Sequence, residues 1–159
     1  MTNPMDENRR RPSMKDYGIS QSEQGLMSWD WVDEQMAKSR NYWICSTRPD
    51  GRPHAAPVWG VWHEGALYFG TGSQKARNFA HQPEIVVHLE SGDDTVIMEG
   101  KVVETRDPER IAPVDKLYAA KYPPFDPTPS EMYFVLRPHT AFAWTEQDFP
   151  NTATRWDLG

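Results

Sequence analysis

The sequence predicts a mainly β protein, an antiparallel β-barrel with short flanking helices. Short β-prone runs of apolar residues recur along the chain, turn signals such as PDGR and HEGA separate them, and few helical segments interrupt them. Strands that follow one another through tight turns close readily into a barrel, which removes exposed sheet edges. We therefore expect one closed antiparallel barrel.

The first predicted element is a helix that ends near residue 38. Ser28 or Asp30 can cap its start, because a short polar side chain accepts a hydrogen bond from the first unpaired N–H groups. Trp29, Val32 and Met36 recur at helical spacing, so they share one face. That face predicts packing of the helix against the barrel.

The remaining elements follow from turn and proline positions. Asp50-Gly51 and Glu64-Gly65 supply residues that tolerate the positive φ of tight turns. Asp107 and Pro108 are typical of a helix start, and four prolines stiffen the loop over 123–129. The expected strands cover residues 42–47, 54–62, 66–70, 85–89, 95–105, 132–136 and 140–144, and the expected further helices cover 74–81 and 107–121.

A glycine-rich segment leads into the helix over 74–81. Gly70 and Gly72 allow close approach of a ligand to the backbone, and Ser73 is placed to cap the helix. Lys75 and Arg77 lie in the first turns, where positive charge is unfavourable unless an anion compensates it. The segment is an anion site on one interpretation and an ordinary solvated helix on the other.

Several motifs together carry a family resemblance. PDGRPH, PVWGVW, LYFGTGS, KARNFAHQP and VVHLESGDDTVIMEGKV occur in this order, over about residues 29–156. In order and spacing they resemble the pyridoxamine 5'-phosphate oxidase-like superfamily of flavin- or deazaflavin-dependent oxidoreductases. The resemblance implies a split β-barrel, a homodimer, and a cofactor that lies between the two barrels.

The resemblance also implies where the cofactor binds. The isoalloxazine ring would lie along the strand that begins at Pro57, where Pro57 lacks an N–H and Gly60 lacks a Cβ, so that a flat ring fits beside the backbone. Trp59 would either cover that ring or pack in the dimer core. Gln74 stands where the oxidases have an arginine, and Asn78 could supplement the phosphate contacts. The implied cofactor residues are Pro57, Val58, Trp59, Gly60, Thr71, Ser73, Gln74, Lys75 and Arg77.

Departures from the family pattern argue against oxidation of vitamin B6. Ala56 and Val61 occupy positions where the pyridoxamine phosphate oxidases carry an arginine and a lysine. Their C-terminal Arg-x-His pair is replaced by the ending TATRWDLG. By resemblance, Arg155 and Trp156 belong to a terminal element that reaches the substrate site or the partner's site.

Composition excludes other classes of protein. The net charge is −6 with a pI near 5.3, whereas nucleic-acid binding needs a clustered positive face. The basic run Arg9–Arg11 lies in a polar segment over 1–25 that has no apolar stretch of signal-peptide or membrane type, and we expect this segment to be a flexible arm before a barrel domain over 26–159. Cys45 has no second cysteine to pair with, which favours the reducing cytoplasm.

The sequence shows no protein-based catalytic machinery. The five histidines lack metal-ligand spacing, so no metal site is expected, and GxSxG is absent. A bound cofactor that performs the redox step fits best, with a small organic molecule as substrate. FMN is favoured over F420, whose polyanionic tail prefers a basic groove. The alternative is a non-catalytic split barrel that holds flavin or haem, with His54 or His88 as a haem ligand.

Overall fold

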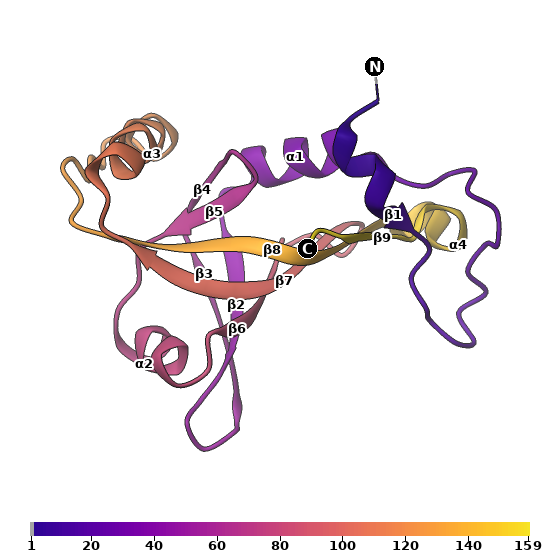
Figure 1. Cartoon of the computed structure of the whole chain (residues 1–159), viewed down its shortest axis with the longest axis horizontal. Coiled ribbons are helices and arrows are strands. Elements are labelled where there is room, and N and C mark those ends of the chain that lie inside the picture. Colours follow the sequence, from indigo (N-terminus) through magenta and orange to yellow (C-terminus); the bar gives the residue numbers. More distant parts are fainter. Residues whose placement is uncertain (1) are drawn as a thin grey trace.

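The strands form one antiparallel sheet that bends back on itself (Figure 1). The computed structural model describes residues 2–159. Within these residues nine strands pair in the order β1-β9-β8-β7-β6-β2-β3, while β5 pairs with both β8 and β4. The strands are β1 Arg9–Arg10, β2 Tyr42–Thr47, β3 Pro53–Val58, β4 Val61–His63, β5 Ala66–Phe69, β6 Glu84–His88, β7 Asp94–Thr105, β8 Tyr133–Thr145 and β9 Thr154–Asp157. The helices are η1 Pro4–Asn8, α1 Trp29–Lys38, α2 Ser73–His81, α3 Pro108–Lys121, η2 Glu146–Asp148 and α4 Phe149–Thr152.

The long strand β8 organises the sheet. One edge of β8 pairs with β7 along its whole length, and the other edge is shared by β5 and β9. Since β4 continues directly from β3 through Trp59 and Gly60, the run β3-β2-β6-β7-β8-β5-β4 returns to its starting point along the chain. The mainly β, barrel-like architecture predicted from the sequence is thereby confirmed.

The core lies inside this ring of strands and beneath α1. The Ser28 hydroxyl accepts a hydrogen bond from Trp31 N at 3.2 Å, as expected of a cap, and Trp29, Val32 and Met36 are buried. A second apolar cluster lies under α3 and contains Ile111, Val114, Tyr118, Tyr122 and Tyr133. Each cluster joins a helix face to the sheet, so the two helices are fixed by burial of apolar surface.

Two predicted strand boundaries were wrong. The strand expected over 54–62 is broken at Trp59 and Gly60 into β3 and β4, because the chain bends there to enter a different part of the sheet. The strands expected over 132–136 and 140–144 are one strand, β8, although Pro138 cannot donate a ladder hydrogen bond. A register shift between Glu99 and Gly100 of β7 lies opposite Pro138 and accommodates it.

The N-terminal arm packs against the C-terminal segment. β1 pairs with β9, so that Arg9 lies opposite Trp156. The Arg11 guanidinium donates to carbonyl oxygens of Ser22, Gln24, Asn151 and Ala153 at 2.7–2.9 Å. Flexibility of residues 1–25 in solution, and their separation from a domain over 26–159, stay predictions.

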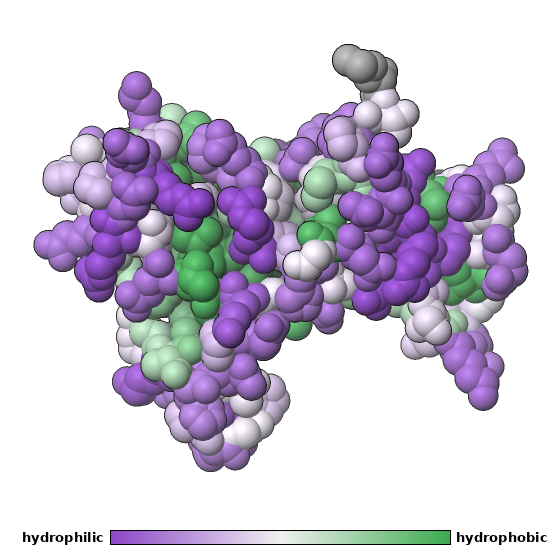
Figure 2. All heavy atoms as spheres, viewed as in Figure 1, coloured by the Kyte–Doolittle hydropathy of each residue, from purple (hydrophilic) through white to green (hydrophobic). Residues whose placement is uncertain are grey.

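Surface character differs between the two ends of the molecule. In the view of Figure 2, apolar surface is concentrated between α3 and α2, while the end that carries α4 is mostly polar. Among the helices described over residues 2–159, none is long and apolar enough to cross a membrane.

Candidate functional site

The start of α2 leaves its N–H groups without a side-chain cap. Ser73, expected to be the cap, is instead the first helical residue and has a φ of 54°, and Gly72 occupies the cap position with no side-chain hydrogen bond. The prediction of a Ser73 cap was therefore wrong. An uncapped helix start carries partial positive charge that favours an anion.

Lys75 adds a full positive charge to this uncapped turn. Its side chain is half-buried, and among residues 2–159 it forms no ion pair. Thr71, just before the helix, makes only a weak contact of its hydroxyl with Gly72 O at 3.5 Å. The backbone turn and both side chains are thus free to contact a phosphate.

Gln74 and Arg77 are engaged within the protein. Arg77 Nη2 donates to Gln74 Oε1 at 2.9 Å, and Gln74 Nε2 donates to Asn78 Oδ1 at 2.8 Å. Buried Asn78 donates in turn to the Ser46 hydroxyl of β2 at 2.9 Å. This chain of hydrogen bonds fixes α2 to the sheet, so Gln74 and Asn78 orient the helix start.

His54 faces the same helix from β3. It is the register partner of Ser46, so its side chain projects toward α2 as that of Ser46 does. Its Nδ1 atom is buried without a hydrogen-bond partner. Burial first, and then the charges of Arg48 and Lys75, lower the pKa of His54. A neutral imidazole therefore lies beside the start of α2, close enough to Lys75 for that charge to lower its pKa.

The strand predicted to carry the isoalloxazine ring is held tightly on its inner side. Pro57 is exposed, and Val58 is buried. A Cβ on Gly60 would lie 3.1 Å from both Leu67 Cδ1 and Tyr68 O. The missing Cβ of Gly60 is therefore required by this chain's own core, and a cofactor ring beside this strand stays a prediction.

Trp59 lies at the bend between β3 and β4 and presents one open side. Its ring stacks on Tyr122 with centroids 4.5 Å apart and planes within 8°, and Phe125 meets it edge-on at 6.2 Å. The side chain of Trp59 is 38% exposed. Trp59 is thus packed on one side against the end of α3. Whether its other side covers a cofactor ring or packs in a dimer core stays a prediction.

The end of α3 fixes this bend through polar contacts. Lys121 Nζ donates to Gly60 O at 3.0 Å and to the Tyr42 hydroxyl at 2.7 Å. Gly60 N donates to the Tyr122 hydroxyl at 3.0 Å, and that hydroxyl donates to Arg40 O at 2.7 Å. Burial first, and then the charge of Arg40, lower the pKa of Lys121 to about 8.

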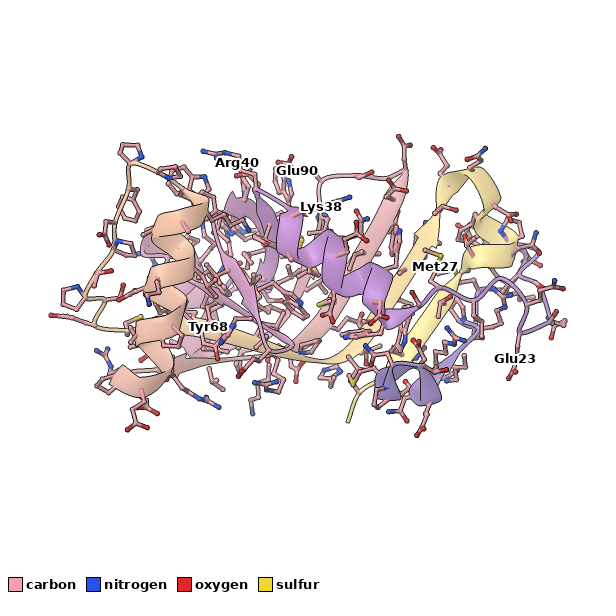
Figure 3. All side chains as sticks on the ribbon, turned by 90° about the horizontal axis from the view of Figure 1, so that it is seen from above. Glu23, Met27, Lys38, Arg40, Tyr68 and Glu90 are labelled. Atoms are coloured by element: carbon pink, nitrogen blue, oxygen red, sulfur yellow. The ribbon has the colours of Figure 1, made fainter. Side chains whose placement is uncertain are left out.

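Sequence reasoning missed this group entirely. Arg40, Tyr42, Lys121 and Tyr122 come from a loop, a strand and the end of a helix, and no spacing along the chain links them to Gly60. Their only local signal is the basic and aromatic end of a helix, which is common on protein surfaces. In Figure 3 Arg40 lies between the C-terminal end of α1 and α3.

The C-terminal pair separates in space. Arg155 is half-exposed, donates to Asp157 Oδ1 at 2.9 Å and lies 5.4 Å from the centre of the Phe142 ring. Trp156 is fully buried and packs edge-on against Trp29, with centroids 5.4 Å apart. Within this chain Trp156 is a core residue, and the role of Arg155 at a partner's site stays a prediction.

The histidines do not gather at a metal site. Over residues 2–159 no group of three or more His, Cys, Asp or Glu side chains is arranged to hold a metal ion. The ring of His88 is stacked on Trp43 with planes within 1°, and its Nδ1 is 2.7 Å from Leu89 O. One ring nitrogen and one ring face of His88 are therefore already engaged.

Solved structures with this fold cover most of the chain. The conserved hypothetical protein Rv2991 from Mycobacterium tuberculosis superposes with a TM-score of 0.67 at 23% identity, over 84% of this chain and 90% of that chain. A protein named F420 reductase gives a TM-score of 0.52 at 22% identity, over 68% and 94%. A FAD-binding protein from Mesorhizobium loti gives 0.55 at 15% identity, over 82% and 94%. At these identities the likeness shows the fold.

The family follows from the sequence comparison. No curated protein matches this chain. The family model described as pyridoxamine 5'-phosphate oxidase matches residues 29–145, which is well over half of the sequence. This match spans the start of α2, the bend at Gly60 and the end of α3. The chain therefore belongs to the pyridoxamine 5'-phosphate oxidase family.

Proposed function

We propose that this chain is an oxidoreductase that uses a flavin-type cofactor, FMN in first place and F420 as the alternative, to move a hydride to or from a small organic substrate. The observation that carries the proposal is the uncapped start of α2 with the unpaired cation of Lys75. Family membership and the names of the F420 reductase and the FAD-binding protein support it.

The chain's own residues would bind and orient the cofactor. Backbone N–H groups at the start of α2, with Thr71, Ser73 and Lys75, would hold its phosphate. The exposed edge of β3 at Pro57 and the ring of Trp59 would border its flat ring system. When bound, a flavin or deazaflavin supplies the hydride chemistry itself.

The residues present do not suit a vitamin B6 phosphate. Ala56 and Val61 have uncharged side chains, so neither position offers a cation to a second phosphate. Ala56 is only partly exposed, and Val61 is buried at 3% exposure. Burying a dianion without partners costs several kcal/mol or more. The proposed substrate is a flat organic acceptor that stacks near Trp59.

A homodimer is part of the proposal. One row of register partners crosses six strands, and every member remains at least partly exposed. It links the proposed cofactor strand to Arg155 through aromatic and apolar side chains, as expected of an interface core. The row consists of Pro57, Trp43, His88, Ile97, Phe142 and Arg155.

Light scattering tests the homodimer. The purified chain should have twice the monomer mass, and Ile97→Glu should give a monomer that binds cofactor poorly, because a carboxylate would be buried in the interface. Tyr17→Glu, at an exposed aromatic of the arm, is the control and should remain dimeric. A monomeric wild-type protein with cofactor bound would refute the dimer. The proposed setting is the cytoplasm, which suits the free thiol of Cys45.

Cofactor binding tests the central proposal. Lys75→Ala should weaken FMN binding by about 1.5–3 kcal/mol, the usual contribution of a charge-assisted hydrogen bond, and should barely affect riboflavin, which has no phosphate. Lys116→Ala, at an exposed lysine of α3, is the matched control. Equal weakening of FMN and riboflavin would show that Lys75 does not contact the phosphate.

The alternative is a binding protein without catalysis. His54 is the histidine that favours it, because its buried Nδ1 has no partner. The absorption spectrum of protein purified from its own host separates flavin, deazaflavin and haem. A haem spectrum that is lost in His54→Ala would support the binding protein over the oxidoreductase.

A further inference from the structure

Two cations that form no ion pair among residues 2–159 lie around the stacked rings of Trp59 and Tyr122. Arg40 Cζ is 5.1 Å from the centre of the Trp59 ring and 5.4 Å from that of Tyr122. Lys121 Nζ is 5.3 Å from the centre of the Tyr122 ring. Over residues 2–159 neither cation forms an ion pair. Positive charge is thus gathered on one aromatic cluster without a paired carboxylate, although Glu90 and Asp94 line the same hollow as Arg40.

Lys121 is the more constrained of the two. Its amine is half-buried and donates two hydrogen bonds to neutral oxygens, those of Gly60 and Tyr42. One N–H of the ammonium group therefore remains to donate to a ligand. Half-buried ammonium groups usually lie beside a carboxylate, because burial disfavours the charged form. The nearby charge of Arg40 makes the charged form still less favourable. An anion bound here would relieve both effects.

The aromatic cluster offers a surface for a flat ring. Tyr122 supports Trp59 from one side, and Trp59 and Phe125 remain 38% and 50% exposed. Aromatic rings stack in offset or edge-on geometry on such surfaces. A carboxylate on the stacked ring would come within reach of cations at its margin, and a guanidinium binds carboxylates with directed hydrogen bonds.

We propose that Trp59, Phe125, Arg40 and Lys121 form a binding site for a planar aromatic carboxylate. The inference deepens the proposed function and, as an assignment of the substrate, rests on it: Trp59 borders the strand on which the cofactor ring is proposed to lie. The acceptor is then a flat ring that carries a negative charge. Arg40 and Lys121 are the residues that select for that charge.

Binding by the full-length chain without cofactor tests the site. The probes are 2-naphthoate, its neutral analogue 2-naphthamide, and acetate, each titrated by calorimetry. 2-Naphthoate should bind at least about fivefold more tightly than 2-naphthamide, the effect of a charge-assisted contact that is partly screened, and acetate should not bind measurably. Trp59→Leu should weaken binding of both naphthalene compounds.

Charge variants identify the selecting residues. Arg40→Gln and Lys121→Met should each reduce the preference for 2-naphthoate severalfold, whereas Lys38→Gln, at an exposed lysine in the last turn of α1, should leave it unchanged. Over residues 2–159 the Arg40 side chain forms no hydrogen bond, and the substitution keeps the Arg40 carbonyl oxygen that accepts from Tyr122, so Arg40→Gln should leave the bend at Gly60 in place. An unchanged preference in Arg40→Gln, equal binding of the two naphthalene compounds, or no binding of either overturns the proposal.

Cofactor titrations on the same protein separate the two proposals. A chain that binds FMN or F420 but not 2-naphthoate overturns this site and leaves the oxidoreductase standing. A chain that binds 2-naphthoate with the expected preference but neither cofactor supports the site and refutes the cofactor proposal. With FMN bound, 2-naphthoate should also perturb the flavin absorption spectrum, and an unperturbed spectrum at saturation overturns the assignment as a substrate site.

Discussion

The half-buried amine of Lys121 should make folding stability depend on pH. In the folded chain its pKa is about 8, compared with 10.5 for a free lysine. Between these values the unfolded chain holds the proton and the folded chain releases it, so stability rises as pH increases. Lys121→Met removes the titrating group. The difference in unfolding free energy between the wild type and Lys121→Met should therefore change with pH in favour of the wild type.

The size of the effect follows from the pKa difference. A fully buried group with this difference would contribute about 3.4 kcal/mol, at about 1.4 kcal/mol per pKa unit. Lys121 is partly open to water, which screens the charge, so we expect roughly 1–1.5 kcal/mol between pH 7 and pH 9.5. Tyr42 and Tyr122, whose pKa values are raised by burial, stay protonated over this range.

Urea unfolding followed by circular dichroism measures the difference. Wild type, Lys121→Met and the exposed-site control Lys116→Met are compared at pH 7.0, 8.0, 9.0 and 9.5, without ligand. The control should follow the wild type. A wild-type advantage that stays constant within about 0.3 kcal/mol, or that falls with pH, would refute the reasoning, because it would mean that the folded state does not disfavour the charged amine.

Three further outcomes are expected. Gly60→Ala should lower the unfolding free energy by about 1–3 kcal/mol in urea titrations, because the new Cβ would press on Leu67 and Tyr68 at 3.1 Å; a neutral effect would show that the bend relaxes freely. Arg11→Gln should speed proteolytic cleavage in residues 12–24 without abolishing the fold, since Arg11 holds that segment through carbonyl oxygens; an unchanged cleavage rate would contradict this role. Stopped-flow reduction should show pyridoxine 5'-phosphate to be a poor substrate even with cofactor bound, and rapid turnover of it alone would overturn the proposed substrate class.

Local signals predicted most of the fold. The cap at Ser28, the glycine turns at Gly51 and Gly65, and the start of α3 at Asp107 depend on neighbouring residues only, and the structure shows each of them. Ser73 was placed wrongly by one residue, because it opens the helix in the left-handed region with a φ of 54° and Gly72 takes the cap position. Strand breaks also depended on partners that no local pattern reveals.

The sequence predicted only one part of the candidate site, the start of α2. Lys75 and the glycines before it form a contiguous motif, so their association could be read directly. The contacts of Lys121 with Gly60 and Tyr42 join residues that are 61 and 79 positions apart. Such contacts depend on how the barrel closes, and neither composition nor local sequence patterns predict them. Tertiary packing, rather than any motif, places α3 against the bend at Trp59.

The pairing of β1 with β9 has a consequence for the order of folding during synthesis. Arg10 lies opposite Arg155, which is made 145 residues later. At about 5–20 residues per second, the arm waits roughly 7–30 s for its partner strand. During that interval the Arg11 guanidinium lacks the carbonyl oxygens of Asn151 and Ala153. The first strand of the sheet is therefore the last to be secured, and a chain truncated before residue 154 would leave its basic arm without a partner strand.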